Sequence, residues 1–176
     1  ITAPDGHIYC LFTTDPATYL LCRDKLFVMT DWLDQYCAAT GKEAPVTTQE
    51  FEDMLLYWRD NDMNGNGDTT DEIPIVLEMG QNGERSLHAL LNAFGIKASS
   101  DAQFCVLDDG TYTMVYEHPR YREFITEMQK LYADKIIDQE FATRYQAEMY
   151  NTMSGNLAGL LGVDEDYTAL ENELAQ

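Results

Sequence analysis

The sequence contains few positively charged residues. Its 176 residues include 11 lysines and arginines against 31 aspartates and glutamates, which gives a formal net charge of −20 at pH 7. A nucleic acid or an anionic membrane surface would repel such a chain, so neither is expected as a partner. The acidity fits a secreted or cell-surface protein.

Long hydrophobic runs and the common short catalytic motifs are also missing. No stretch approaches the roughly eighteen apolar residues of a membrane-spanning helix. No G-x-S-x-G elbow, phosphate-binding P-loop or H-E-x-x-H zinc motif occurs. We therefore expect no enzyme activity. A glycosidase-type carboxylate pair stays open as the less favoured alternative, because acidic residues are abundant.

Cysteines are few, and their spacing does not suit a metal or redox site. The four are Cys10, Cys22, Cys37 and Cys105, with no C-x-x-C pair and no histidine at metal-binding spacing. This pattern disfavours zinc and thioredoxin-like sites. Each cysteine has apolar neighbours, so disulfide pairing and buried free thiols both remain open.

The length and the hydrophobic content set the scale of the fold. A hydrophobic share of 45% is sufficient for a core, and 176 residues suit one domain or one large lobe. The chain begins at Ile1 without an initiator methionine or a signal peptide, so we expect it to be part of a longer protein.

Apolar periodicity and turn signals predict alternating strands and helices, which favours an α/β fold with a partly parallel sheet flanked by helices. Thr30 is expected to cap one helix, and Thr47 to Glu50 form a capping box for the next. Asp108-Asp109-Gly110 separates two strand-like segments, as in a β-hairpin. Strands are expected at 7–12, 25–29, 73–77, 104–107, 111–116 and 157–161. Helices are expected at 30–41, from 47 to the polar run at 62, at 86–94, from 119 through 132, at 139–150 and at 164–174.

The polar run at 62–74 has the pattern of a calcium-binding loop. Oxygen-bearing side chains recur at alternate positions, at Asp62, Asn64 and Asn66. Gly67 stands at the sixth position, where a sharp bend brings later ligands round. Ca²⁺ prefers six to eight oxygen ligands at about 2.3–2.6 Å. The predicted ligands are Asp62, Asn64, Asn66, Asp68 through its backbone carbonyl, Asp71 and Glu72.

This loop is EF-hand-like, but its closure differs from that of a standard EF-hand. Ile73 stands at the twelfth position, where an EF-hand carries a bidentate glutamate. Asp71, Glu72 or both must therefore close the loop. The alternative is a solvated turn, since asparagine and glycine are ordinary turn formers.

Two polar loops follow predicted strands, at the position where ligands collect in open α/β sheets. Their amides, carboxylates and guanidinium group can hydrogen-bond sugar hydroxyls, and the tyrosine can stack on a sugar ring. The alternative is that both are plain solvated loops. The candidate ligand-binding residues are Gln81, Asn82, Glu84 and Arg85 in the first loop and Asp164 and Tyr167 in the second.

The two tryptophans are the other candidates for sugar stacking. Trp32 and Trp58 each lie at helical spacing with other apolar residues. This spacing predicts that both rings belong to the hydrophobic core.

Several segments, taken in order, resemble the family 1 extracellular solute-binding proteins of ABC importers. The resemblance is greatest to the lipoprotein and alginate-oligosaccharide-binding branch, whose members carry a similar Asn-Gly-Asn-Gly…Asp-Glu-Ile-Pro calcium loop. This loop has one residue more between Gly67 and Asp71, and the chain is less than half as long as such proteins. The segments that carry the resemblance are 3–9, 30–34, 45–51, 62–74, 108–110 and 130–141.

The resemblance implies a non-catalytic, solute-binding component of a bacterial importer with a structural Ca²⁺ site. Residues 1–24 are then expected to be a hinge-crossing segment, and residues 25–176 a lobe like those of periplasmic binding proteins. The implied solute is an oligosaccharide, and the implied partners are the membrane permease subunits. The implied protein is monomeric and extracellular, either a cell-surface lipoprotein or periplasmic. A calcium-stabilised adhesion or interaction module is the alternative.

Overall fold

The central feature of the fold is a three-stranded mixed sheet. A computed structural model of the chain describes residues 2, 5–9, 25–77, 90–98 and 104–163. The strands are β1 (Lys25–Val28), β2 (Ile73–Val76) and β5 (Ala158–Val163), in the order β1-β5-β2. Strand β5 pairs antiparallel with β1 and parallel with β2. The prediction of a partly parallel sheet is therefore confirmed.

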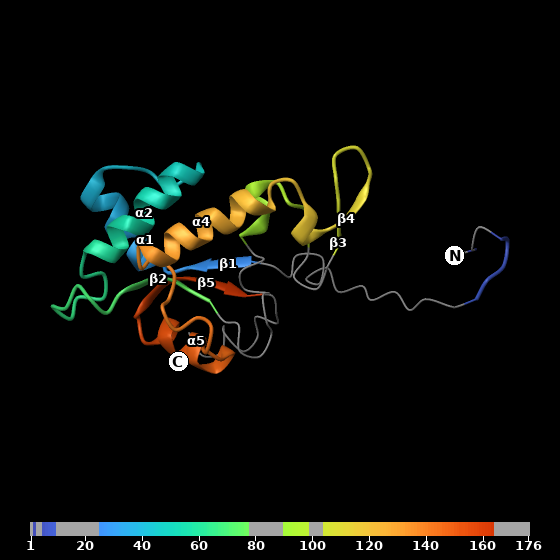
Figure 1. Cartoon of the computed structure of the whole chain (residues 1–176). Coiled ribbons are helices and arrows are strands. Elements are labelled where there is room, and N and C mark those ends of the chain that lie inside the picture. Colours follow the sequence, from blue (N-terminus) through green and yellow to red (C-terminus); the bar gives the residue numbers. More distant parts are fainter. Residues whose placement is uncertain (1, 3–4, 10–24, 78–89, 99–103, 164–176) are drawn as a thin grey trace.

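Helices cover both faces of this sheet. Figure 1 shows α1 (Thr30–Thr40), α2 (Thr48–Asp60) and α4 (Tyr121–Ala133) on one side and α5 (Gln146–Ser154) on the other. The larger core cluster joins α1, α2 and α4 to β2, while a smaller one joins α5 to β2 and β5. No described helix is long and apolar enough to span a membrane.

Local sequence signals explain where several elements begin and end. The Thr47 hydroxyl accepts the backbone N–H of Glu50 at 3.2 Å, and the Glu50 carboxylate accepts the N–H of Thr47 at 3.0 Å. This is the predicted capping box. Gly41, with φ of 70°, ends α1 in the left-handed conformation. The N-cap of α1 is Met29, so the assignment of Thr30 as the cap was wrong.

The hairpin is also confirmed. Strands β3 (Phe104–Val106) and β4 (Tyr112–Met114) pair antiparallel, with Cys105 opposite Thr113. A 3₁₀ turn, η3 (Val115–Glu117), leads from the hairpin towards α4.

Other predicted boundaries need correction. Residues 7–9 form no strand, because they pair with none of the described strands. Helix α4 begins at Tyr121, after a turn that starts at His118, and not at Pro119. Residues 91–94 form a 3₁₀ helix, η2 (Leu91–Phe94), ended by Gly95. The remaining parts of the predicted elements, residues 10–12, 86–89 and 164–174, lie outside the described residues.

The helix expected at 139–150 begins later, at Gln146. The Asp138 carboxylate accepts the N–H of Glu140 at 3.0 Å and is also bonded by the guanidinium group of Arg144. These bonds hold the intervening residues in turns and delay the helix. Such local side-chain bonds leave little trace in the apolar periodicity of the sequence.

Candidate metal-binding loop

The predicted calcium loop connects the end of α2 to the start of β2. In Figure 1 it lies at the end of the sheet opposite the carboxyl ends of β2 and β5. One helix enters the loop and one strand leaves it. The loop therefore lacks the helix pair that opens in EF-hand sensors.

The carboxylate of Asp62 organises the first half of the loop. Its Oδ1 accepts the backbone N–H groups of Gly65 at 2.6 Å and Asn66 at 3.1 Å, and its Oδ2 accepts that of Gly67 at 2.8 Å. Gly65 and Gly67 have φ values of 77° and 90°, which favour glycine. The chain consequently wraps around one carboxylate.

The side chains of Asn64 and Asn66 converge on Asp71. The amide nitrogen of Asn66 donates to Asp71 Oδ2 at 2.7 Å, and that of Asn64 donates to Asp71 Oδ1 at 3.4 Å. Their amide oxygens accept backbone N–H groups two residues further along the chain. A half-turn of each amide would direct its oxygen at the Asp71 carboxylate, an arrangement that is favourable only with a cation between them.

Glu72 contributes a buried carboxylate with one free oxygen. Its Oε1 accepts the N–H of Met63 at 2.9 Å, while Oε2 is buried without a hydrogen-bond partner. Burial raises the pKa of Glu72, and the neighbouring Asp71 raises it further. An unsatisfied buried acceptor is costly, and a bound cation would relieve that cost. The donor chemistry therefore fits a hard cation such as Ca²⁺.

Asp68 uses its side chain locally. Its Oδ1 accepts the N–H and the hydroxyl of Thr70, at 2.9 and 2.6 Å, and these bonds lower its pKa. These bonds use only Oδ1 of Asp68, and the predicted role of its backbone carbonyl as a cation ligand stays a prediction. No three His, Cys, Asp or Glu side chains within the described ranges form a metal-binding group by themselves, so the proposed ligand set depends on asparagine oxygens.

The carboxyl ends of the strands that precede the two predicted solute-binding loops lie at the other end of the sheet. Because β2 and β5 are parallel neighbours, their carboxyl ends meet at one edge, and both predicted loops begin there. The candidate residues themselves, Gln81, Asn82, Glu84, Arg85, Asp164 and Tyr167, lie outside the described residues.

The tryptophans are core residues, as predicted. Trp32 and Trp58 are fully buried and their rings meet edge to face, with centroids 5.7 Å apart. Among the described cysteines, Cys37 and Cys105 are free thiols, and burial raises the pKa of the Cys105 thiol. Cys10 and Cys22 lie outside the described residues.

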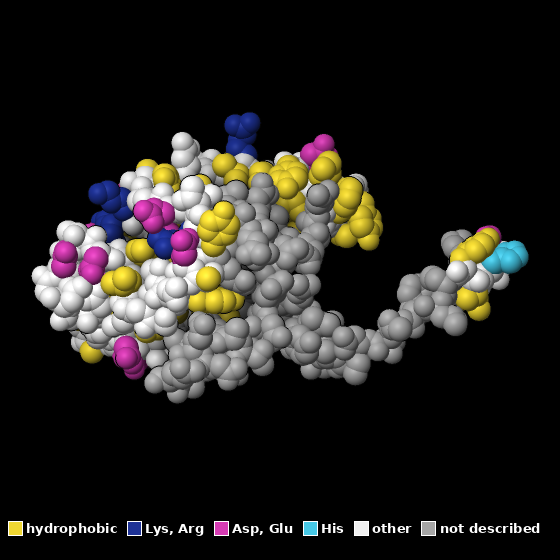
Figure 2. Space-filling model, turned by 90° about the horizontal axis from the view of Figure 1, so that it is seen from below, with side chains coloured by type: hydrophobic (Ala, Val, Ile, Leu, Met, Phe, Trp, Pro, Cys, Tyr) yellow, Lys and Arg dark blue, Asp and Glu magenta, His cyan; other side chains and the backbone are white. Residues whose placement is uncertain are grey.

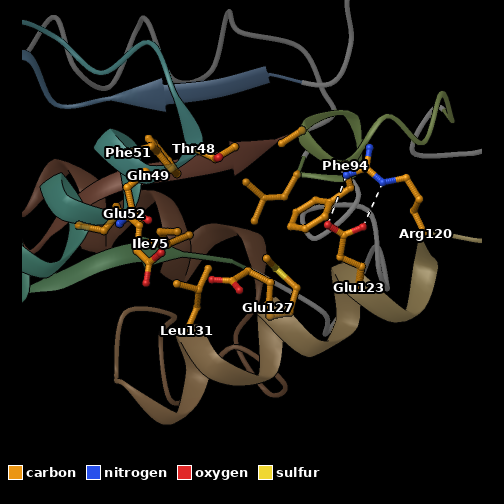
Figure 3. A pocket seen from close by; sticks show the side chains of 14 residues that line it. Thr48, Gln49, Phe51, Glu52, Ile75, Phe94, Arg120, Glu123, Glu127 and Leu131 are labelled. Carbon is orange, nitrogen blue, oxygen red and sulfur yellow. Dashed lines mark hydrogen bonds and ion pairs between the residues drawn. The ribbon is translucent and has the colours of Figure 1, made fainter.

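A cavity of about 290 Å³ lies between α2, η2 and α4 (Figure 3). Phe51, Phe94 and Met128 contribute to its apolar lining. The charged groups on its rim are paired, for example Arg120 with Glu123 at 3.0 Å. The charges of this pair are therefore satisfied within the protein.

Sequence reasoning missed one buried ion pair, between Asp138 and Arg144. Their side chains are 3% and 12% exposed. The sequence signal for this pair is that Arg144 follows the segment 130–141 by three residues. That spacing alone does not show that the two side chains are buried. The pair lies beside β2, since Ile137 forms a parallel bridge with Ile75.

Comparison with known proteins identifies relatives of this chain. No family model matches it. Over 145 residues, 80% of its length, it is 31% identical to the fructooligosaccharide ABC transporter substrate-binding protein FusA of Streptococcus pneumoniae. Its homologues are ABC-transporter substrate-binding proteins. Lipoprotein LipO of Bacillus subtilis is 23% identical over 158 residues, 89% of the chain.

Solved structures support the same relationship. The structure of S. pneumoniae FusA in complex with kestose matches 98% of this chain with a TM-score of 0.70 and 25% identity. An EF-hand mutant of FusA in complex with fructo-nystose matches equally well. The chain covers 26% of FusA and 29% of LipO, so it spans about a quarter of the length of these curated relatives. The predicted resemblance is confirmed.

Proposed function

We propose that this chain is part of the solute-binding component of an ABC importer and that it binds a neutral oligosaccharide without transforming it. The observation that carries this proposal is its 31% identity to FusA over 80% of the chain. The convergence of the carboxyl ends of β2 and β5 supports it, because ligands of open α/β sheets collect at such an edge.

The described fold corresponds to part of one lobe of such a protein. We assign residues 25–176 to the second lobe and residues 1–24 to the hinge crossing. The solute is then captured between two lobes that close on the hinge and is delivered to the permease subunits. We further propose that the protein is a monomer and extracellular, either a cell-surface lipoprotein or periplasmic. Its similarity to lipoprotein LipO supports the first of these two locations.

The test is a calorimetric titration of the complete gene product with kestose. We expect saturable binding, because FusA was solved in complex with kestose. Chromatography of the sugar after prolonged incubation should recover it unchanged. Absence of binding to kestose and to a panel of neutral oligosaccharides would overturn the proposal, and released monosaccharide would favour the glycosidase alternative.

We also propose that residues 62–72 bind a structural Ca²⁺ ion. The network around Asp62 and the free Oε2 of buried Glu72 support this site. Its distance from the carboxyl ends of the strands makes it a support for the fold rather than part of the solute site. The FusA EF-hand mutant is consistent with such a role, since that structure contains fructo-nystose.

Removing calcium should destabilise the protein. A ligand that binds only the folded state adds RT ln(1 + [L]/Kd), or about 1.4 kcal/mol at ten times Kd. We therefore expect EDTA to lower the melting temperature measured by circular dichroism. Asp62→Ala should lower it as well and abolish the effect of EDTA. Asp108→Ala, which removes an exposed carboxylate from the hairpin, should leave the effect of EDTA intact. If neither EDTA nor Asp62→Ala changed the melting temperature, the proposed calcium site would be refuted.

A further inference from the structure

The β3–β4 hairpin presents an unusual outward surface. Phe104, Val106, Tyr112 and Met114 are 57%, 42%, 77% and 36% exposed, and together we call them the hairpin face. Figure 2 shows hydrophobic side chains gathered over this hairpin. Contiguous exposed apolar surface on a soluble domain commonly marks a binding site.

The strand register explains why these four side chains lie together. Phe104 is paired with Met114 and Val106 with Tyr112, so two cross-strand pairs stand side by side. The alternate residue of β3, Cys105, is 2% exposed and belongs to the core. The hairpin therefore buries a small residue and presents its largest apolar side chains to solvent, the reverse of the usual alternation.

The chemistry of the hairpin face suits an uncharged ligand with both apolar and hydroxyl surfaces. Neither strand, Phe104–Val106 or Tyr112–Met114, contains a charged residue, although the whole chain carries a net charge of −20. The weakly positive C–H groups of a sugar ring can rest on the electron-rich face of an aromatic ring. The Tyr112 hydroxyl can also donate to or accept from a sugar hydroxyl.

The position of the hairpin suits the same ligand. In Figure 1 it projects from the body on the side towards which β2 and β5 end. A solute held at that edge of the sheet can therefore extend towards the hairpin. The calcium loop lies at the opposite end and is remote from this surface.

We propose that the hairpin face is a stacking subsite for a neutral oligosaccharide, with Tyr112 and Phe104 as the stacking rings. This inference rests on the proposed function and extends it to a particular surface. The rings add contact area for sugar units beyond those held at the carboxyl ends of the strands. Their stacking contributes affinity without requiring a charge on the sugar.

The experiment compares kestose and longer fructooligosaccharides, titrated into the complete gene product and its variants. Tyr112→Ala and Phe104→Ala are each expected to weaken binding of the longer sugars roughly tenfold, the effect typical of losing an anchoring ring. Tyr112→Phe keeps the ring and should bind within about twofold of the unchanged protein. Tyr145→Ala is the matched control, because Tyr145 is a 55% exposed aromatic residue outside the hairpin.

Each outcome decides the proposal. Melting curves first confirm that the variants are folded. Equal sugar affinities for Tyr112→Ala, Phe104→Ala and the unchanged protein would overturn the subsite while leaving the proposed function standing. Absence of sugar binding to the unchanged protein would overturn both. If Tyr112→Ala leaves sugar affinity unchanged but converts an oligomer into a monomer in sedimentation, the hairpin face is a self-association surface and the sugar subsite is wrong.

Discussion

Replacing Arg144 with methionine is expected to lower the free energy of unfolding by about 3–5 kcal/mol. The guanidinium group bonds both carboxylate oxygens of Asp138, and its Nη1 donates to the Thr152 hydroxyl at 3.2 Å. Its hydrogen bond with Asp138 also raises the pKa of Arg144. Without the guanidinium group, Asp138 becomes a buried carboxylate that lacks its counter-charge. Urea denaturation at a fixed calcium concentration measures the loss.

The position of this ion pair explains why its loss should also weaken the attachment of the neighbouring segment to β2. The N–H of Asp138 donates to the carbonyl of Ile75 at 2.9 Å, so the pair stabilises the segment that lies along β2. Replacing both charges, in Asp138→Leu with Arg144→Met, should recover much of the loss because no unpaired charge remains.

A surface pair supplies the control for this experiment. Lys97 and Asp108 are 75% and 99% exposed, so Lys97→Met should leave the unfolding curve almost unchanged. If Lys97→Met and Arg144→Met had equal effects, burial would not be the reason for the stability of the Asp138–Arg144 pair.

Features stabilised by neighbouring residues could be predicted from the sequence. The bonds between Thr47 and Glu50 span three residues, and Gly41 ends its helix through a bond to the carbonyl of Cys37. The hairpin turn is similarly short, and Gly110 adopts a φ of 84° in it. In each case the residue types that form the bonds lie within a few positions, so their spacing carries the information.

Features that depend on distant contacts could not be predicted in this way. Nothing in the residues of β5 shows that this strand pairs antiparallel with β1 and parallel with β2. The Asp108-Asp109-Gly110 turn predicted the two strands of the hairpin but not which face would be buried. The calcium loop could be recognised because its proposed ligands follow a known spacing. The bonds of Asp138 that delay α5 are also local, but they follow no recognisable spacing.

The importance of Gly159 likewise could not be predicted from the sequence, because it depends on contacts with residues distant in the chain. A Cβ atom at this position would stand 2.6 Å from Cε3 of both Trp32 and Trp58. Gly159→Ala is therefore expected to cost about 3 kcal/mol of unfolding free energy, the upper end of the overpacking range, because one methyl group meets two buried rings. The entropy gained by replacing a glycine, about 0.4–1 kcal/mol, is too small to compensate.

Neither side of this contact can move away easily. The indole N–H of Trp32 donates to Asn156 at 2.9 Å, and that of Trp58 donates to the Trp32 carbonyl at 3.2 Å. The strand is held as well, since the carbonyl of Gly159 accepts the N–H of Met29 at 2.9 Å. We therefore expect the added methyl group to strain the core rather than be accommodated by a shift.

Two comparisons isolate steric overlap as the cause. Gly110→Ala introduces a side chain at a φ of 84° with no heavy atom within 4 Å of the new Cβ, so it should cost only the backbone penalty of about 1–2 kcal/mol. Trp58→Phe removes part of the ring system that Gly159→Ala would meet. In that background Gly159→Ala should cost less than in the unchanged protein, because the two sites are in direct contact. If its cost is the same in both backgrounds, the close packing of β5 against the tryptophans is not what requires a glycine.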